Sequence, residues 1–307
     1  MPTDDPDDPI LHEVRAATTW GAALHVASAA LARTGASATP ELDAGVLLGH
    51  LTGARRASLL AYRESALPAE QAAAYAALIE RRLAGEPVAY LTGHREFMGL
   101  DFLTDSRALI PRPETEHLVE AALVLARARL ARGAAPLVAD IGTGSGAIAF
   151  SVAALEPRLP RLYATDVSDA ALALAAENAA RLGVAARVTL LAGDLLDPLP
   201  EPVDLLLANL PYIAPREAPT LQIDVTRYEP ALALYGAEDG LGHFRRFFAA
   251  APARLLPGAA LLLEFGYDQR HALEALARAH FPQATLRVIG DYAGWDRVLV
   301  VETPAAE

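Results

Sequence analysis

The chain has 307 residues, 53% of them hydrophobic, and its 26 basic and 38 acidic side chains give a formal net charge of −12. This length and composition allow one large and one smaller folded domain with buried cores. The chain has no cysteine, which excludes disulfides, thiolate metal sites and a cysteine nucleophile. The acidic balance disfavours direct binding of nucleic acid, because the summed field repels a phosphate backbone.

The sequence contains no apolar stretch near the roughly 20 residues that a membrane-spanning helix needs. Residues 1–9 are acidic, whereas a secretory signal would be basic. We therefore expect a cytoplasmic protein without a membrane partner, and a disordered acidic tip over residues 1–9.

Residues 10–85 have helical spacing with helix-start signals at Thr19, Pro40 and Pro68. This segment is predicted to be a small helical bundle domain. After Gly85 the pattern changes to short β-type runs over 88–91 and 95–102, separated by glycine. These runs predict a β-hairpin linker over residues 86–108.

Residues 109–307 alternate apolar runs of strand length with helical segments, which predicts an α/β domain with a parallel, doubly wound sheet. The runs span residues 137–141, 161–166, 187–191, 203–208, 260–265, 285–289 and 297–301. The connection between the last two runs is too short for a crossover helix, so these two strands should pair antiparallel. A mostly parallel, Rossmann-like seven-stranded sheet with one antiparallel strand at its far end is the class I S-adenosylmethionine (SAM) methyltransferase arrangement.

A glycine-rich turn follows the first of these strands, in the segment DIGTGSG over residues 140–146. Its glycines let the backbone approach a ligand, and its spacing differs from the Gly-x-Gly-x-x-Gly of dinucleotide sites, which favours SAM. A carboxylate at the end of the second strand can accept ribose hydroxyls, and one after the third strand can meet adenine. The predicted cofactor contacts are Asp140, Gly142, Thr143, Gly144, Ser145, Gly146, Asp166, Asp194, Leu195 and Asn209.

Asn209, Leu210, Pro211 and Tyr212 follow the fourth strand and nearly match the Asn-Pro-Pro-Tyr signature of enzymes that methylate planar amide or amine nitrogens. Such a nitrogen is a poor nucleophile because its lone pair is delocalised. We predict that the Asn209 oxygen and the Leu210 carbonyl accept its N–H groups, while Tyr212 stacks on the planar acceptor. Pro211 pushes Leu210 towards an extended conformation. Leu210 replaces the usual first proline, which predicts a looser grip.

Further motifs are more specific: EPVAYLTG over 86–93 with REF over 95–97, IPRPETE over 110–116, YEP over 228–230 with DGL over 239–241, and AGWDRV over 293–298. Through them, most of residues 40–300 resembles the protein glutamine N5-methyltransferases that modify peptide chain release factors. The resemblance implies SAM as methyl donor and the glutamine of a Gly-Gly-Gln loop as acceptor. It also implies that Thr115 and Glu116 lie beside the methionine end of SAM, and that the helical domain helps bind the release factor.

Two alternatives remain at this stage. An N6-adenine or other nucleic-acid amino-methyltransferase would share the Asn209 segment, because adenine also presents a planar amine, but it should carry a basic groove. A SAM-binding interaction module without catalytic activity would have no need of Asn209 and Tyr212. We expect no metal site, and we assign none of the eight histidines to catalysis.

Overall fold

The computed structural model describes residues 9–305, which form two compact units. The first unit contains the described residues up to Gly93 together with Gln222–Tyr228. The second contains His94–Leu221 and the chain from Glu229 onward. The predicted acidic tip lies outside the described residues except for Pro9, which begins the first helix.

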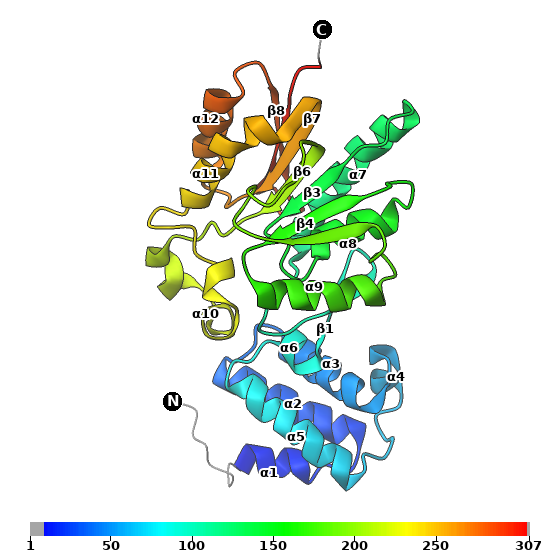
Figure 1. Ribbon diagram of the computed structural model, residues 1–307. Coiled ribbons are helices and arrows are strands. Elements are labelled where there is room, and N and C mark those ends of the chain that lie inside the picture. Colours follow the sequence, from blue (N-terminus) through cyan, green and yellow to red (C-terminus); the bar gives the residue numbers. More distant parts are fainter. Residues whose placement is uncertain (1–8, 306–307) are drawn as a thin grey trace. The chain divides into compact units, whose positions relative to one another are not determined.

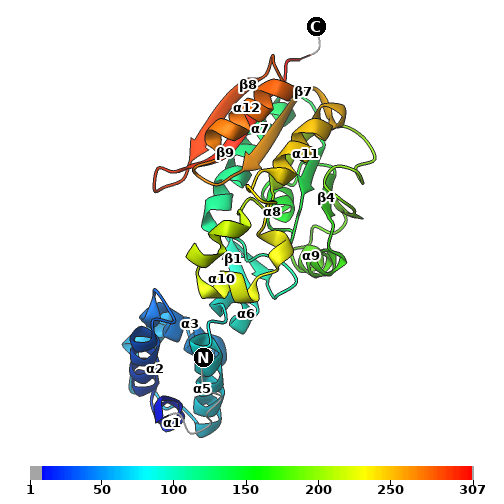
Figure 2. The same ribbon diagram turned by 90° about the vertical axis from the view of Figure 1, so that its left-hand side faces the viewer.

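The first unit is helical, and Figure 2 shows the helices of its N-terminal part in blue and cyan and its short helix near residue 225 in yellow. The helix starts predicted from Thr19, Pro40 and Pro68 are confirmed: the Thr19 hydroxyl accepts the N–H of Ala22 at 3.2 Å, and Pro40 is the first residue of its helix. The helices are α1 (Pro9–Arg15), α2 (Trp20–Thr34), α3 (Pro40–Thr52), α4 (Arg56–Ala61), α5 (Ala69–Leu83), α6 (Val88–Thr92) and α10 (Ile223–Tyr228).

Polar groups inside this helical core are paired. The Tyr75 hydroxyl donates to the Ala44 carbonyl at 2.9 Å, and Arg82 Nε lies 2.8 Å from Asp43 Oδ2 with both side chains buried. Buried polar groups require such partners, because an unpaired one loses its hydration without compensation. The apolar core around them includes Leu31, Leu47, Leu48, Leu59, Ala76 and Ile79.

The β-type prediction for residues 88–91 was wrong, because this run forms α6. Pro87 precedes the helix and Gly93 ends it at φ 74°, so the punctuation that was taken to break a strand is that of a helix. The hairpin begins immediately afterwards. It pairs β1 (His94–Phe97) antiparallel with β2 (Leu100–Leu103).

The second unit contains a seven-stranded sheet in the order β5-β4-β3-β6-β7-β9-β8. All seven predicted runs are strands, and β8 and β9 pair antiparallel as expected. The antiparallel strand is β9, which lies one position inside the edge, between β7 and β8. The strands are β3 (Val138–Ile141), β4 (Leu162–Asp166), β5 (Val188–Ala192), β6 (Val203–Asn209), β7 (Leu255–Glu264), β8 (Thr285–Gly290) and β9 (Asp296–Glu302).

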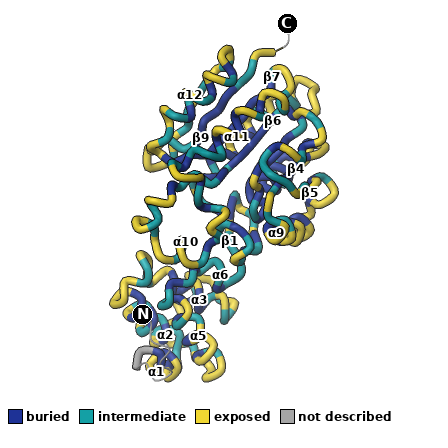
Figure 3. Tube along the Cα trace, turned by 60° about the vertical axis from the view of Figure 1, so that its left-hand side comes forward, coloured by how far each residue is buried: buried dark blue, intermediate teal, exposed yellow. Residues whose placement is uncertain are grey.

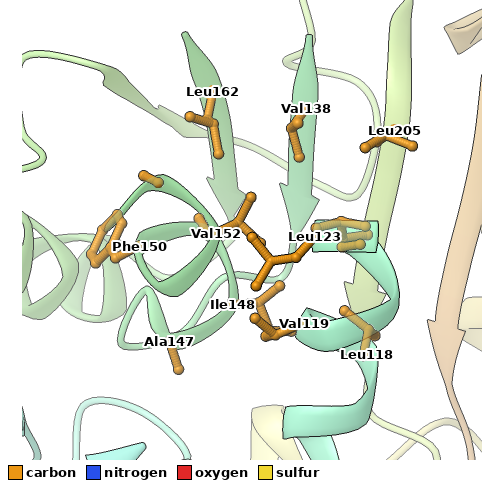
Figure 4. Packing of buried hydrophobic residues seen from close by; sticks show 14 of the residues in the cluster. Leu118, Val119, Leu123, Val138, Ala147, Ile148, Phe150, Val152, Leu162 and Leu205 are labelled. Carbon is orange, nitrogen blue, oxygen red and sulfur yellow. The ribbon is translucent and has the colours of Figure 1, made fainter. Parts of the chain in front are cut away.

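Helices cover both faces of this sheet (Figure 1). On one face α7 (Glu116–Ala131), α8 (Ala147–Leu155) and α9 (Asp169–Arg181) pack on side chains such as Val138, Leu162 and Leu205, as Figure 4 shows for α7 and α8. On the other face α11 (Gly242–Ala250) and α12 (Arg270–His280) cover the alternate residues of the strands. The central strands are therefore buried on both sides (Figure 3).

Short 3-10 helices complete the second unit: η1 (Pro113–Thr115), η2 (Pro215–Thr220), η3 (Ala231–Ala233) and η4 (Ala251–Arg254). The strand order reverses between β3 and β6, because the chain passes from β3 outward to β4 and β5 and then returns to the other side of β3. Loops that leave the carboxyl ends of two such strands diverge and leave a crevice between them. The glycine-rich turn follows β3 and the Asn209 segment ends β6, so topology brings the two motifs to one crevice.

Candidate active site

A cavity of about 150 Å³ opens at this crevice. Loops at the carboxyl ends of β3, β4, β5 and β6 line it, together with the segment that leads into η1. All of its lining residues belong to the second unit. The cavity therefore collects the loops that carry both predicted motifs. The predicted residues that line it are Thr115, Gly142, Thr143, Gly144, Ser145, Asp166, Asp194, Leu195, Asn209, Leu210 and Pro211.

Asp140 supports the glycine-rich turn from below and is fully buried. Its Oδ2 accepts the Thr143 hydroxyl at 2.7 Å and the Ala149 N–H at 3.2 Å, which ties the turn to the start of α8. Its Oδ1 has no hydrogen-bond partner within residues 9–305. Burial raises the pKa of Asp140 to about 7, against the opposite effect of these two donors. Asp140 thus shapes the turn and does not line the cavity.

The glycines of the turn have different neighbours. Gly144 has φ 58° and lines the cavity, and a Cβ built on it would lie 3.8 Å from Ala108 Cβ. Gly146 has φ 86° and lies outside the lining, and a Cβ built there would fall 1.9 Å from the ring of Phe150. The left-handed backbone at Gly144 serves the cavity, whereas Gly146 makes room for an aromatic ring of α8.

Asp166 at the end of β4 connects two loops. Its Oδ2 accepts the Gly144 N–H at 2.8 Å and its Oδ1 accepts the Ser168 N–H at 2.9 Å. A carboxylate oxygen can accept more than one hydrogen bond, so each oxygen retains capacity for a hydroxyl donor in the cavity. Asp166 therefore lines the cavity with acceptor capacity that the backbone does not use up.

Asp194 and Leu195 form the next part of the wall, after β5. Asp194 forms an ion pair with Arg246 of α11, with both side chains partly exposed. Leu195 adopts φ 46°, and its carbonyl accepts the Thr165 hydroxyl at 3.1 Å. This bond holds the strained loop in place beside the cavity.

Asn209 is the last residue of β6, and its side chain is fixed by a contact with η1. Its Nδ2 donates to Thr115 Oγ1 at 3.2 Å. Leu210 is buried, and its Cδ2 lies 3.4 Å from a Cβ built on Gly142, so the two motifs are in contact. The structure thus brings Thr115, Asn209, Leu210 and Pro211 together with the glycine-rich turn.

Tyr212 and Glu116, like Asp140 and Gly146, are predicted site residues that lie outside the lining. The Tyr212 side chain packs against the apolar cluster of α11 and α12, its carbonyl accepts from Gln269 Nε2 at 2.9 Å, and burial raises the pKa of its hydroxyl. The Glu116 carboxylate accepts the N–H of Met98 at 2.9 Å, in the turn between β1 and β2. Glu116 therefore holds the hairpin turn, where Met98 has φ 54°.

Two carboxylates near the cavity were given no role from the sequence, although Glu229 belongs to the quoted YEP motif over 228–230. Glu264 ends β7 directly opposite Asn209 in the parallel pairing, and only 2% of it is exposed. Glu229 is buried, accepts the Ile110 N–H at 3.0 Å and forms an ion pair with Arg112, which fixes the segment ahead of η1. A signal for Glu264 existed, because an acidic residue that closes an otherwise apolar strand is unusual.

The lining fits SAM on three observations. The backbone at Gly142 and Gly144 is left-handed and free of Cβ atoms at the cavity wall, where the cofactor would pass closely. Asp166 offers acceptors for hydroxyl donors. Asn209 also lines the cavity, and its side chain is held by Thr115, the last residue of η1. Within residues 9–305, no group of His, Cys, Asp and Glu side chains is arranged to hold a metal ion, and no helix is long and apolar enough to cross a membrane.

A strand order of this kind, with its cavity at the reversal point, defines a class I SAM methyltransferase fold. A family model described as "Methyltransferase small domain" matches residues 119–225. Among solved structures, the hMettl16 catalytic domain, in complex with the MAT2A 3'UTR hairpin 6, is similar at 18% identity with a TM-score of 0.52. That match covers 70% of this chain and 79% of the other, and this likeness shows the fold alone.

The N-terminal residues identify the family more narrowly, since the "PrmC N-terminal domain" model matches residues 22–93. The release factor glutamine methyltransferase of Moorella thermoacetica is 49% identical over 84% of this chain and 89% of its own length. The enzyme of the same name from Bordetella pertussis is 48% identical over 84% and 93%, respectively. The chain belongs to the release factor glutamine methyltransferase family, as its motifs predicted.

Proposed function

We propose that this protein transfers a methyl group from SAM to the side-chain amide nitrogen, N5, of the glutamine in the Gly-Gly-Gln loop of peptide chain release factors. Membership of the family supports the reaction and the substrate. The observation that carries the proposal for the site is the Asn209 side chain, which stands at the cavity wall with its nitrogen bonded to Thr115.

The cofactor-binding residues in this proposal are those that line the cavity. Gly142, Gly144 and Ser145 would face the methionine part, Asp166 the ribose, and Asp194 with Leu195 the adenine. SAM supplies an electrophilic methyl group on a sulfonium.

The chain's own residues prepare the acceptor nitrogen. An amide lone pair is delocalised into its carbonyl, so the nitrogen attacks only if its hydrogens are held and positive charge on it is favoured. Asn209 Oδ1 and the Leu210 carbonyl are the oxygens that would accept the two N–H groups of the glutamine. Pro211 favours an extended Leu210, which aims that carbonyl. A general base is not required for attack, because the nitrogen becomes acidic only as the methyl arrives.

In this proposal the release factor is the protein partner, the reaction takes place in the cytoplasm, and the helical unit contributes to binding that substrate. The N6-adenine alternative is not favoured, because relatives that match most of the chain are named for release factor glutamine methylation. The net charge of −12 also opposes a polyanionic substrate.

Mass spectrometry tests the proposal. Purified release factor is incubated with enzyme and SAM, and its Gly-Gly-Gln peptide is expected to gain one methyl group on the glutamine. Asn209→Ala should abolish the transfer while SAM binding, measured by calorimetry, is largely kept. Tritium from labelled SAM that appeared in DNA or RNA and not in the release factor would reject the proposal.

A further inference from the structure

Glu264 is a buried carboxylate that neither the sequence motifs nor the proposed acceptor contacts explain. It lies at the end of β7, in register with Asn209 at the end of β6. On its other side β9 places Val298 opposite it. Its Oε2 has no partner within residues 9–305. Burying an acid in this way is unfavourable unless its remaining contacts compensate or it serves the site.

The contacts of Glu264 lead to the acceptor segment. Strand register sets Glu264 beside Asn209, and the Thr115 and Asn209 side chains act as donors that lower the pKa of its carboxyl. The Asn209 amide has two N–H groups, and its nitrogen also donates to Thr115 Oγ1 at 3.2 Å. Thr115 accepts in that bond, so its own single proton remains available to the Glu264 carboxylate. Glu264, the register neighbour of Asn209, also offers an acceptor for the second hydrogen of the Asn209 amide.

This arrangement decides which end of the Asn209 amide faces the acceptor. Reversing the amide would place Oδ1 against the Glu264 carboxylate and leave Nδ2, a donor, towards the substrate nitrogen. A donor there cannot accept an N–H of glutamine. Carboxylate–oxygen repulsion in a buried position opposes the reversed state.

We propose that Glu264 is a positioning residue, which acts through Thr115 and Asn209 to hold the Asn209 oxygen towards the glutamine amide. The role of Glu264 in catalysis rests on the proposed function, whereas its hold on Asn209 exists without any substrate. Glu264 touches neither the acceptor nor the cofactor in this account.

Ionisation of Glu264 matters, because the deprotonated carboxylate accepts whereas the neutral acid also donates. Burial raises the pKa of Glu264 to about 7, and the Thr115 and Asn209 donors oppose that shift. Among the charged groups that face it, Arg297 of β9 lowers the pKa and Glu114 of η1 raises it. The negative charge of Glu264 also contributes to the raised pKa of the Tyr212 hydroxyl, in the segment that follows β6. Positioning should therefore be complete above pH 7 and weaken as the pH falls through that value.

Two variants separate positioning from packing. Glu264→Met replaces the side chain with an apolar one of similar size and removes the acceptor, so kcat for release factor should fall by roughly tenfold or more with KM for SAM nearly unchanged. Glu264→Gln keeps one acceptor oxygen, so it should recover part of that loss. It should also lose the decline in kcat that the wild type shows between pH 8 and pH 6. A purely structural role predicts wild-type kcat in both variants at temperatures below unfolding.

A second measurement needs neither substrate nor cofactor. The chain contains two asparagines, Asn178 and Asn209, so selective 15N labelling yields two side-chain amide groups in NMR spectra, each with a pair of N–H signals. Asn178 is the internal control, because its amide is held by the backbone of Leu103 and Ser145, away from Glu264. The Asn209 signals should titrate near pH 7 in the wild type, shift in Glu264→Met and stop titrating in Glu264→Gln.

The outcomes distinguish the two proposals. If the wild type does not methylate release factor, the proposed function fails and the NMR result alone judges the positioning role. If the wild type is active but Glu264→Met retains its kcat, or if the Asn209 signals ignore both pH and substitution, the positioning role is refuted.

Discussion

Gly146→Ala is expected to destabilise the second unit much more than Gly144→Ala, although both glycines belong to one turn. A Cβ on Gly146 would lie 1.9 Å from Phe150 Cε2 and 2.4 Å from Cδ2 and Cζ. Phe150 is fully buried in the core cluster on the α8 face of the sheet, so its ring has no free space to enter. At Gly144 the nearest atom would be 3.8 Å away.

The magnitudes follow from two terms. An L-residue in the left-handed region costs roughly 1–2 kcal/mol, and this applies to both variants. Overpacking a buried core adds about 1–3 kcal/mol, and this applies only at Gly146. Gly146→Ala should therefore lower the free energy of unfolding by about 2–5 kcal/mol and Gly144→Ala by about 1–2 kcal/mol. At about 2–4 °C per kcal/mol, the melting temperature of Gly146→Ala should fall by roughly 4–20 °C.

Thermal unfolding followed by circular dichroism measures these shifts, and calorimetry with SAM measures binding. In Gly144→Ala the larger effect should be on SAM affinity and the smaller one on the free energy of unfolding, because the new methyl group enters the cavity wall. The double variant Gly146→Ala/Phe150→Leu should be less destabilised than the sum of its single variants, because the smaller side chain relieves the overlap. Equal melting temperatures for the two glycine variants, or additive effects with Phe150→Leu, would refute the reasoning.

Three further predictions rest on buried charges. Asp140 has a pKa raised from 3.8 to about 7, so the folded state binds more protons between these values and the stability should decline as pH rises through them. The free energy of unfolding should fall by on the order of 4 kcal/mol between pH 4 and pH 8 because of Asp140. Urea unfolding of Asp140→Asn should lack this fall, and an unchanged pH dependence would contradict the prediction. Arg82→Met leaves Asp43 charged and buried, so it should lower the free energy of unfolding by about 3–5 kcal/mol. Arg82→Met/Asp43→Leu should recover most of this loss in the same unfolding assay. A double variant as unstable as the single one would contradict the claim that the unpaired Asp43 charge causes the loss. Glu229→Gln should weaken SAM binding measured by calorimetry, because the ion pair that holds the Ile110–Arg112 segment of the cavity wall is lost. A SAM affinity equal to that of the wild type would show that this ion pair does not support the cavity.

Local patterns were sufficient for much of the fold. Each strand of the sheet appeared as an apolar run, because a strand buried on both faces needs apolar residues at successive positions. The two last runs revealed their antiparallel pairing through the length of their connection. Residues 88–91 were misjudged because a short apolar run has no period long enough to separate helix from strand.

The same distinction between local sequence patterns and tertiary contacts applies to the candidate site. The sequence by itself determined that a glycine-rich turn and an Asn-Leu-Pro-Tyr segment each end a strand, because both signals lie within a few consecutive residues. Only the tertiary structure decided that Thr115 bonds Asn209, that Glu264 lies opposite it, that Gly146 makes room for Phe150 and that Tyr212 turns to the apolar cluster. These neighbours depend on strand order and register, which bring together residues distant in the chain and leave no periodic trace in either segment.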